Sequence, residues 1–78
     1  MYNYYAIEVQ TNADGTGGVV PYGFANKGEC EDKFLDLRKA ARQSTVMVHT
    51  VMFIDNRGNH MEKPAVYIHP VEETPTEE

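Results

Sequence analysis

One stretch decides the fold of this chain: TVMVHTVMFIDNRGNHMEKPAVYIH, residues 45–69. Side chains alternate between the two faces of a strand, and residues 46–54 carry apolar side chains at both parities. Asp55-Asn56-Arg57-Gly58 has the composition of a type I turn, with Asp first and Gly fourth. The stretch therefore predicts a long β-hairpin whose first strand has two apolar faces, and whose second strand covers residues 60–69.

Two further strand signals lie near the start of the chain. Residues 2–11 alternate as a strand does and are followed by a turn-forming run at residues 12–18. Residues 19–24 contain Pro21, which lacks an N–H, and Gly23, which lacks a side chain. They are expected to form either a short edge strand paired with the first strand or an extended loop.

The helix is predicted from caps and periodicity. Asn26 is a good N-cap, and Glu29 follows it by three residues, close to a capping box. A single apolar stripe then recurs at helical spacing, and the helix closes at Gln43-Ser44. The stripe consists of Cys30, Phe34, Leu37 and Ala41.

These elements predict an α+β fold: a two-layer sandwich of a three- to four-stranded, largely antiparallel sheet with one helix on one face, in the order β-(β)-α-β-β. The register of the hairpin is expected to pair Met47 with Tyr67 and Phe53 with Met61. The helix is expected to cover the more apolar parity: Tyr5, Ile7, Val9, Val46, Val48, Met52, Ile54, Val66 and Ile68.

The opposite parity forms the helix-free face of this prediction. One helix covers one face only, so we expect the other to be partly exposed or buried against a second molecule. Its candidate interface residues are Tyr2, Tyr4, Met47, His49, Val51, Phe53, Met61 and Tyr67, with Ala65 beside them.

Size and charge limit the possible functions. Residues 1–70 are expected to form one domain, and residues 71–78 a disordered acidic tail. A core this small usually needs a disulfide, a metal or oligomerisation as a supplement, and a single cysteine excludes an internal disulfide. The composition thus favours a homo-oligomer, with a dimer first, that also has the potential to bind another protein.

Four acidic residues account for most of the net charge of −5. They are Glu72, Glu73, Glu77 and Glu78, and without them the remainder carries −1. The seven Lys and Arg residues form no basic stripe, so no nucleic-acid partner is expected. No apolar run is long enough for a membrane span, and the expected location is the cytoplasm, or the host cytoplasm if a phage encodes the chain.

No residue set identifies a reaction, a cofactor or a metal site. Cys30 lies on the inward stripe of the helix, as a buried small hydrophobe does. The histidines lack metal-ligand spacing. The sequence favours a non-enzymatic structural or protein-interaction module. The alternative is a small ligand-binding or catalytic protein with a site at the oligomer interface near His49 and Tyr67.

A resemblance is carried by four segments: YYAIEVQ (4–10), NADGTG (12–17), VHTV (48–51) and DNRGN (55–59). They are similar to segments of small proteins carried by phages and prophages of Gram-positive bacteria, a group with no assigned activity. The resemblance implies an accessory or structural phage protein and assigns no functional residue.

Overall fold

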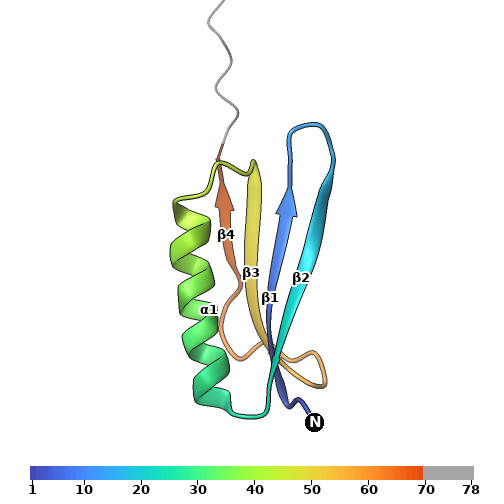
Figure 1. The fold of residues 1–78 in the computed structure, drawn as a ribbon, viewed down its shortest axis with the longest axis vertical. Coiled ribbons are helices and arrows are strands. Elements are labelled where there is room, and N and C mark those ends of the chain that lie inside the picture. Colours follow the sequence, from blue (N-terminus) through green and yellow to red (C-terminus); the bar gives the residue numbers. More distant parts are fainter. Residues whose placement is uncertain (70–78) are drawn as a thin grey trace, which may run out of the picture.

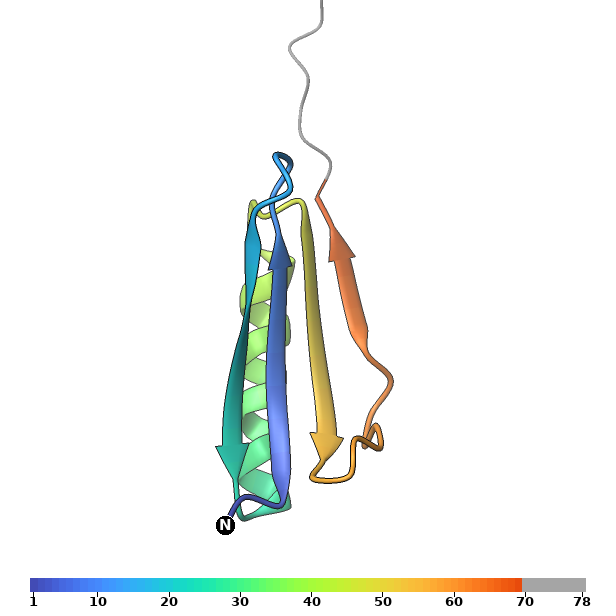
Figure 2. The ribbon, with the colours of Figure 1, turned by 90° about the vertical axis from the view of Figure 1, so that its right-hand side faces the viewer.

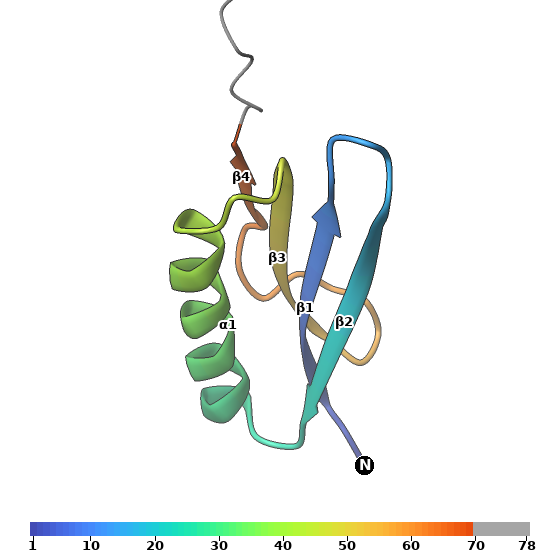
Figure 3. The same cartoon turned by 45° about the horizontal axis from the view of Figure 1, so that its top comes forward.

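The computed structural model describes residues 1–69 and contains one helix against one sheet (Figure 1). The elements are β1 (Tyr4–Thr11), β2 (Gly17–Phe24), α1 (Lys27–Arg42), β3 (Val48–Asp55) and β4 (Ala65–Ile68). The strands form a four-stranded antiparallel sheet in the order β2-β1-β3-β4. Figure 3 shows the helix and the sheet as two separate layers. The predicted α+β class is confirmed, whereas the predicted tail lies outside the described residues.

The first hairpin joins β1 to β2. β1 begins at Tyr4, two residues later than predicted, and the possible strand at residues 19–24 is a strand that already begins at Gly17. β2 lies at the edge of the sheet, where Pro21 deprives no inner neighbour of a hydrogen bond. In the turn, the Asp14 carboxylate accepts hydrogen bonds from the Thr16 hydroxyl at 2.6 Å and from its backbone N–H at 3.0 Å.

The helix forms as predicted. The side chain of Asn26 accepts a hydrogen bond from the Glu29 backbone N–H at 3.1 Å, which satisfies one of the first N–H groups of α1. The buried residues of α1 are the four of the apolar stripe: Cys30, Phe34, Leu37 and Ala41. Amphipathic spacing alone therefore located the packed side of α1 correctly.

The second hairpin joins β3 to β4 through the predicted turn. The Gly58 N–H donates to the Asp55 carbonyl at 3.1 Å, and Gly58 has φ of +87°, which suits a residue without Cβ. The Asp55 carboxylate accepts bonds from the Asn59 backbone and side chain and from the Arg57 N–H. These bonds, with Asn59 the main donor, hold the pKa of Asp55 below its usual value.

The returning strand is shorter than predicted. Only an isolated bridge between Ile54 and His60 precedes β4, and His49, not Met47, lies opposite Tyr67. Residues 62–64 leave the ladder, and Pro64 among them has no N–H to donate. Beside the turn the predicted register holds, because the Ile54–His60 bridge and the hydrogen bond from the Met61 N–H to the Phe53 carbonyl at 2.8 Å agree with the predicted pairing of Phe53 and Met61. In β4 the register is displaced by two residues, and an even displacement leaves each side chain on its face.

The predicted assignment of the sheet faces is wrong. α1 covers the parity expected to be helix-free, so Ala6, Val51 and Phe53 are buried beneath it together with the helix stripe. The opposite parity, which includes Ile7, Val66 and Ile68, is the one without a helix. Val66 is 56% exposed and Ile68 66% exposed.

The connection from β2 to β3 explains the helix position. Both strands are antiparallel to β1, so they run parallel to one another with β1 between them. Figure 2 looks onto the face opposite α1 and shows that the crossover through the helix is right-handed. Crossovers of this kind are almost always right-handed, so chain connectivity fixed the covered side, whatever the count of apolar residues on each face.

The core between α1 and the sheet is small. Among residues 1–69, the buried apolar residues are Ala6, Cys30, Phe34, Leu37, Ala41, Val51 and Phe53. Three of these seven are Ala or Cys, which lets the helix lie close to the sheet. No helix within residues 1–69 has both the length and the apolar character that crossing a bilayer requires.

Candidate functional site

The predicted interface residues do not form an accessible face. Three of them are buried beneath α1, at 0%, 1% and 3% exposure: Val51, Phe53 and His49. Tyr4, Met61 and Tyr67 are partly buried and pack against the same core. Met47 precedes β3 and is half-buried, and its carbonyl accepts a hydrogen bond from His69. Apart from Tyr2, these residues pack toward the interior of the fold, because the helix covers their parity.

Tyr2 alone among the candidates is strongly exposed, at 57%. It precedes β1 and departs from the strand alternation that placed it beside Tyr4. Its ring lies 6.2 Å from the Tyr5 ring, edge to face. A Cβ atom at residue 23 would come within 2.5 Å of the Tyr2 ring, so the ring can lie here only because residue 23 is glycine. Tyr2 thus sits beside Tyr5 and Gly23, on the side away from α1.

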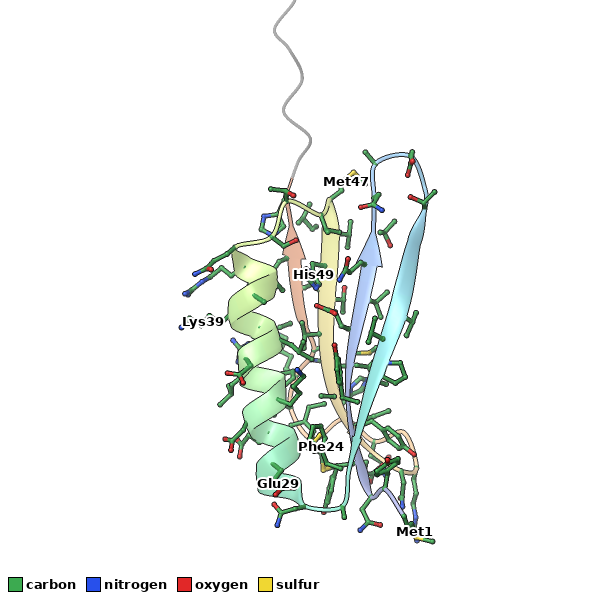
Figure 4. All side chains as sticks on the ribbon, in the orientation of Figure 1. Met1, Phe24, Glu29, Lys39, Met47 and His49 are labelled. Carbon is green, nitrogen blue, oxygen red and sulfur yellow. The ribbon has the colours of Figure 1, made fainter. Side chains whose placement is uncertain are left out.

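A buried polar pair lies under the helix. His49 on β3 and Glu8 on β1 have exposures of 3% and 9%, and the His49 Nε2 atom lies 2.7 Å from the Glu8 Oε2 atom. Figure 4 shows His49 on the helix side of the sheet. The carboxylate can only accept a hydrogen bond, so Nε2 donates. The two side chains therefore satisfy one another in the interior.

The second ring nitrogen of His49 lacks such a partner. Nδ1 is buried and makes no hydrogen bond within residues 1–69. With Nε2 as donor in a neutral ring, Nδ1 is an acceptor whose lone pair is unused. A catalytic histidine needs substrate within hydrogen-bond reach, and α1 separates this ring from solvent. Of the two residues named in the alternative prediction, His49 is therefore closed to a ligand, whereas Tyr67 is only partly buried.

The side of the sheet away from α1, which faces the viewer in Figure 2, is here called the open face. Register places the following side chains on it: Tyr5, Ile7, Val9, Thr11, Val19, Pro21, Val48, Thr50, Met52, Ile54, Val66 and Ile68. None of these residues is charged. Val9 pairs with Val19 and with Thr50, and Thr50 pairs with Val66, so one row crosses all four strands.

The apolar content of the two strand parities did not predict which face of the sheet the helix covers. Glu8, Gln10 and His49 lie on the covered parity and make it the less apolar of the two in the sequence. Two of the three pair with one another, which removes most of the cost of burying them. A right-handed crossover between two parallel strands was the stronger constraint on where the helix packs.

The remaining candidate groups are structural. Cys30 is fully buried, and desolvation raises the pKa of its thiol to about 11, so it is a poor nucleophile. Within residues 1–69, no three His, Cys, Asp or Glu side chains come together as a metal site would require. His69 donates from Nε2 to the Ala41 carbonyl at 2.8 Å and thereby ties the end of β4 to the end of α1.

Comparisons with known proteins give no relative from which to transfer a function. The chain matches no protein-family model, no curated protein and no solved structure.

Proposed function

We propose that the protein is a non-enzymatic, homo-oligomeric structural or protein-interaction module, and that two copies pair through their open faces. The observation that carries this proposal is the uncharged, apolar character of the open face across all four strands. Exposed apolar patches of this kind mark interaction sites.

A second copy fits the open face because the face is neutral. A twofold interface brings the same surface patch of both subunits together, so the patch must be complementary to itself. A charged patch would repel its own copy, whereas Ile7, Val9 and Val66 can pack on equivalent side chains. Two sheets packed face to face lie about 10 Å apart, with their side chains interdigitated.

The open face is large enough for a modest dimer. It belongs to three strands of eight residues and one of four. At about 3.3 Å per residue and about 4.8 Å between strands, its flat footprint is about 450 Å². Two copies supply about 900 Å² before the relief of the side chains is added, near the lower limit of roughly 1,000 Å² for specific interfaces.

Pairing through the sheet edges is less favourable. β4 has only four residues, and short edge strands resist pairing with other chains. β2 is longer, but Pro21 has no N–H to offer a further strand. The small core of one subunit adds to the argument, since a dimer would provide a second apolar layer on the other side of the sheet.

Sedimentation equilibrium at micromolar concentration tests the proposal. The expected mass is twice the 8.8 kDa of one chain. A mass of one chain at every concentration would overturn it. A dimer that forms through the helix or an edge strand would also contradict it, and variants of the open face distinguish these cases.

A further inference from the structure

A basic groove lies where α1 meets β4, on the side of the sheet away from the open face. Its hollow has a volume of about 330 Å³ and is lined by Leu35, Arg38, Lys39, Arg42 and Tyr67. The first four residues come from the C-terminal half of α1, and Tyr67 comes from β4. Figure 4 shows Lys39 projecting from the exposed side of the helix. Three cations thus line a single hollow together with Leu35 and Tyr67.

Within residues 1–69, no carboxylate lies within ion-pair distance of these three cations. Arg38 and Arg42 are four positions apart, and Lys39 and Arg42 are three apart, spacings at which like charges on a helix repel one another. The helix dipole favours cations in the last turn. The helix dipole does not account for Arg38, which lies about one turn before Arg42 and also lines the hollow.

Arg38 is held in a position suited to an anion. Its Nε donates to the Tyr67 hydroxyl at 3.4 Å, and its guanidinium carbon lies 5.5 Å from the centre of the Phe34 ring. Its two terminal nitrogens make no hydrogen bond within residues 1–69. A guanidinium oriented in this way presents a fork of N–H donors that matches both oxygens of a carboxylate.

We propose that this groove binds the acidic segment of the chain itself, residues 71–78. That segment carries Glu72, Glu73, Glu77 and Glu78, against the three cations of the groove. The chain also leaves the described fold close by, because His69 is bonded to Ala41, the residue before Arg42.

The lengths agree with this assignment. Eight extended residues reach about 26–29 Å, whereas Leu35 to Arg42 spans about 10 Å of helix. Attachment to the same molecule gives the segment an effective concentration in the millimolar range, which favours an otherwise weak contact. The groove and the open face lie on different sides, so this proposal does not depend on dimer formation.

Side-chain NMR of the full chain tests the contact. Resonances of Arg38 Nε–H, Arg42 Nε–H and the Lys39 side chain are compared between the natural sequence and the variant E72Q/E73Q/E77Q. The matched control removes the same number of charges from exposed sites elsewhere, as E31Q/D32N/E62Q. The expected result is a shift of the groove resonances in the first variant and none in the control.

Salt and a peptide complete the test. At about 1 M salt, where screening acts over about 3 Å, the shift is expected to vanish. A synthetic peptide of residues 71–78, added at millimolar concentration to the E72Q/E73Q/E77Q variant, is expected to move the resonances back. The proposal would be overturned if both variants shifted the groove resonances equally or if neither did. A shift that persists at high salt would also overturn it, and so would a peptide without effect.

Discussion

The Nε2 atom of His49 lies 2.7 Å from the Oε2 atom of Glu8, although the two residues are not directly opposite in the ladder between β3 and β1. Glu8 pairs with Val51 and His49 pairs with Gln10, so the contact is diagonal across the covered face. This diagonal contact allows two polar side chains to lie beneath an otherwise apolar helix. The same two polar residues make the covered face the less apolar one in the sequence.

The pair predicts non-additive stability changes. Glu8→Leu alone leaves His49 Nε2 unsatisfied, and His49→Phe alone leaves a buried carboxylate unsatisfied, so each is expected to cost about 1–3 kcal/mol or more of unfolding free energy. The double variant leaves neither group unpaired and is expected to cost clearly less than the sum. Urea denaturation of the three variants measures this coupling; additive losses would mean that the contact contributes nothing.

Truncation of single side chains of α1 to alanine should lower the stability at buried positions and not at exposed ones. Phe34 is 1% exposed and Leu37 6%, whereas Leu35 is 49% exposed. Phe34→Ala and Leu37→Ala are therefore expected to lower the unfolding free energy by about 2–5 kcal/mol. Leu35→Ala is the matched control, with an expected change within about 0.5 kcal/mol. Similar losses at Leu35 and Leu37 in chemical denaturation would disprove the packing of α1 described above.

The thiol of Cys30 should react only when the subunit opens. Burial raises its pKa from 9.0 to about 11, so the folded state holds the thiol proton more tightly than the unfolded state. The stability that this shift contributes is fully present below pH 9.0, the pKa of the thiol in the unfolded chain. It is lost as the pH rises through about 11, the pKa of the thiol in the folded state. At about pH 8, a disulfide reagent should modify Cys30 slowly, at a rate that increases with urea. Rapid labelling without urea would contradict its burial.

Neighbouring lysine substitutions on β3 should have opposite effects. Val51→Lys places a charge beneath α1 and is expected to unfold the subunit. Thr50→Lys places a charge on the open face. Water can solvate this charge in an isolated chain, but in a dimer packed through the open faces the charge would be buried. The expected product is a folded monomer. Val66→Lys, on β4, should behave like Thr50→Lys.

Circular dichroism and light scattering distinguish these outcomes. If Thr50→Lys and Val51→Lys give the same product, whether a folded dimer or an unfolded chain, the assignment of the two faces is wrong. A folded Thr50→Lys dimer would exclude the open face as the interface even if the faces are assigned correctly.

Local signals in the sequence predicted the elements well, and long-range relationships less so. The Asn26 cap, the buried stripe of α1 and the turn at Asp55 each depend on residues close in sequence, and each was predicted correctly. The covered face depends on the connection between β2 and β3 and on a contact between residues 8 and 49. Neither can be deduced from the apolar pattern of a single strand, so most of the candidate interface residues lie on the face that α1 covers.

An isotope-filtered NOE experiment tests the central claim most directly. A sample that mixes ¹³C-labelled and unlabelled chains reports only contacts between different copies. The account predicts intermolecular NOEs among the methyl groups of Ile7, Val9, Met52 and Val66, because these side chains lie on the open face. The absence of such NOEs, or intermolecular NOEs confined to α1 or to the edges of β2 and β4, would contradict it.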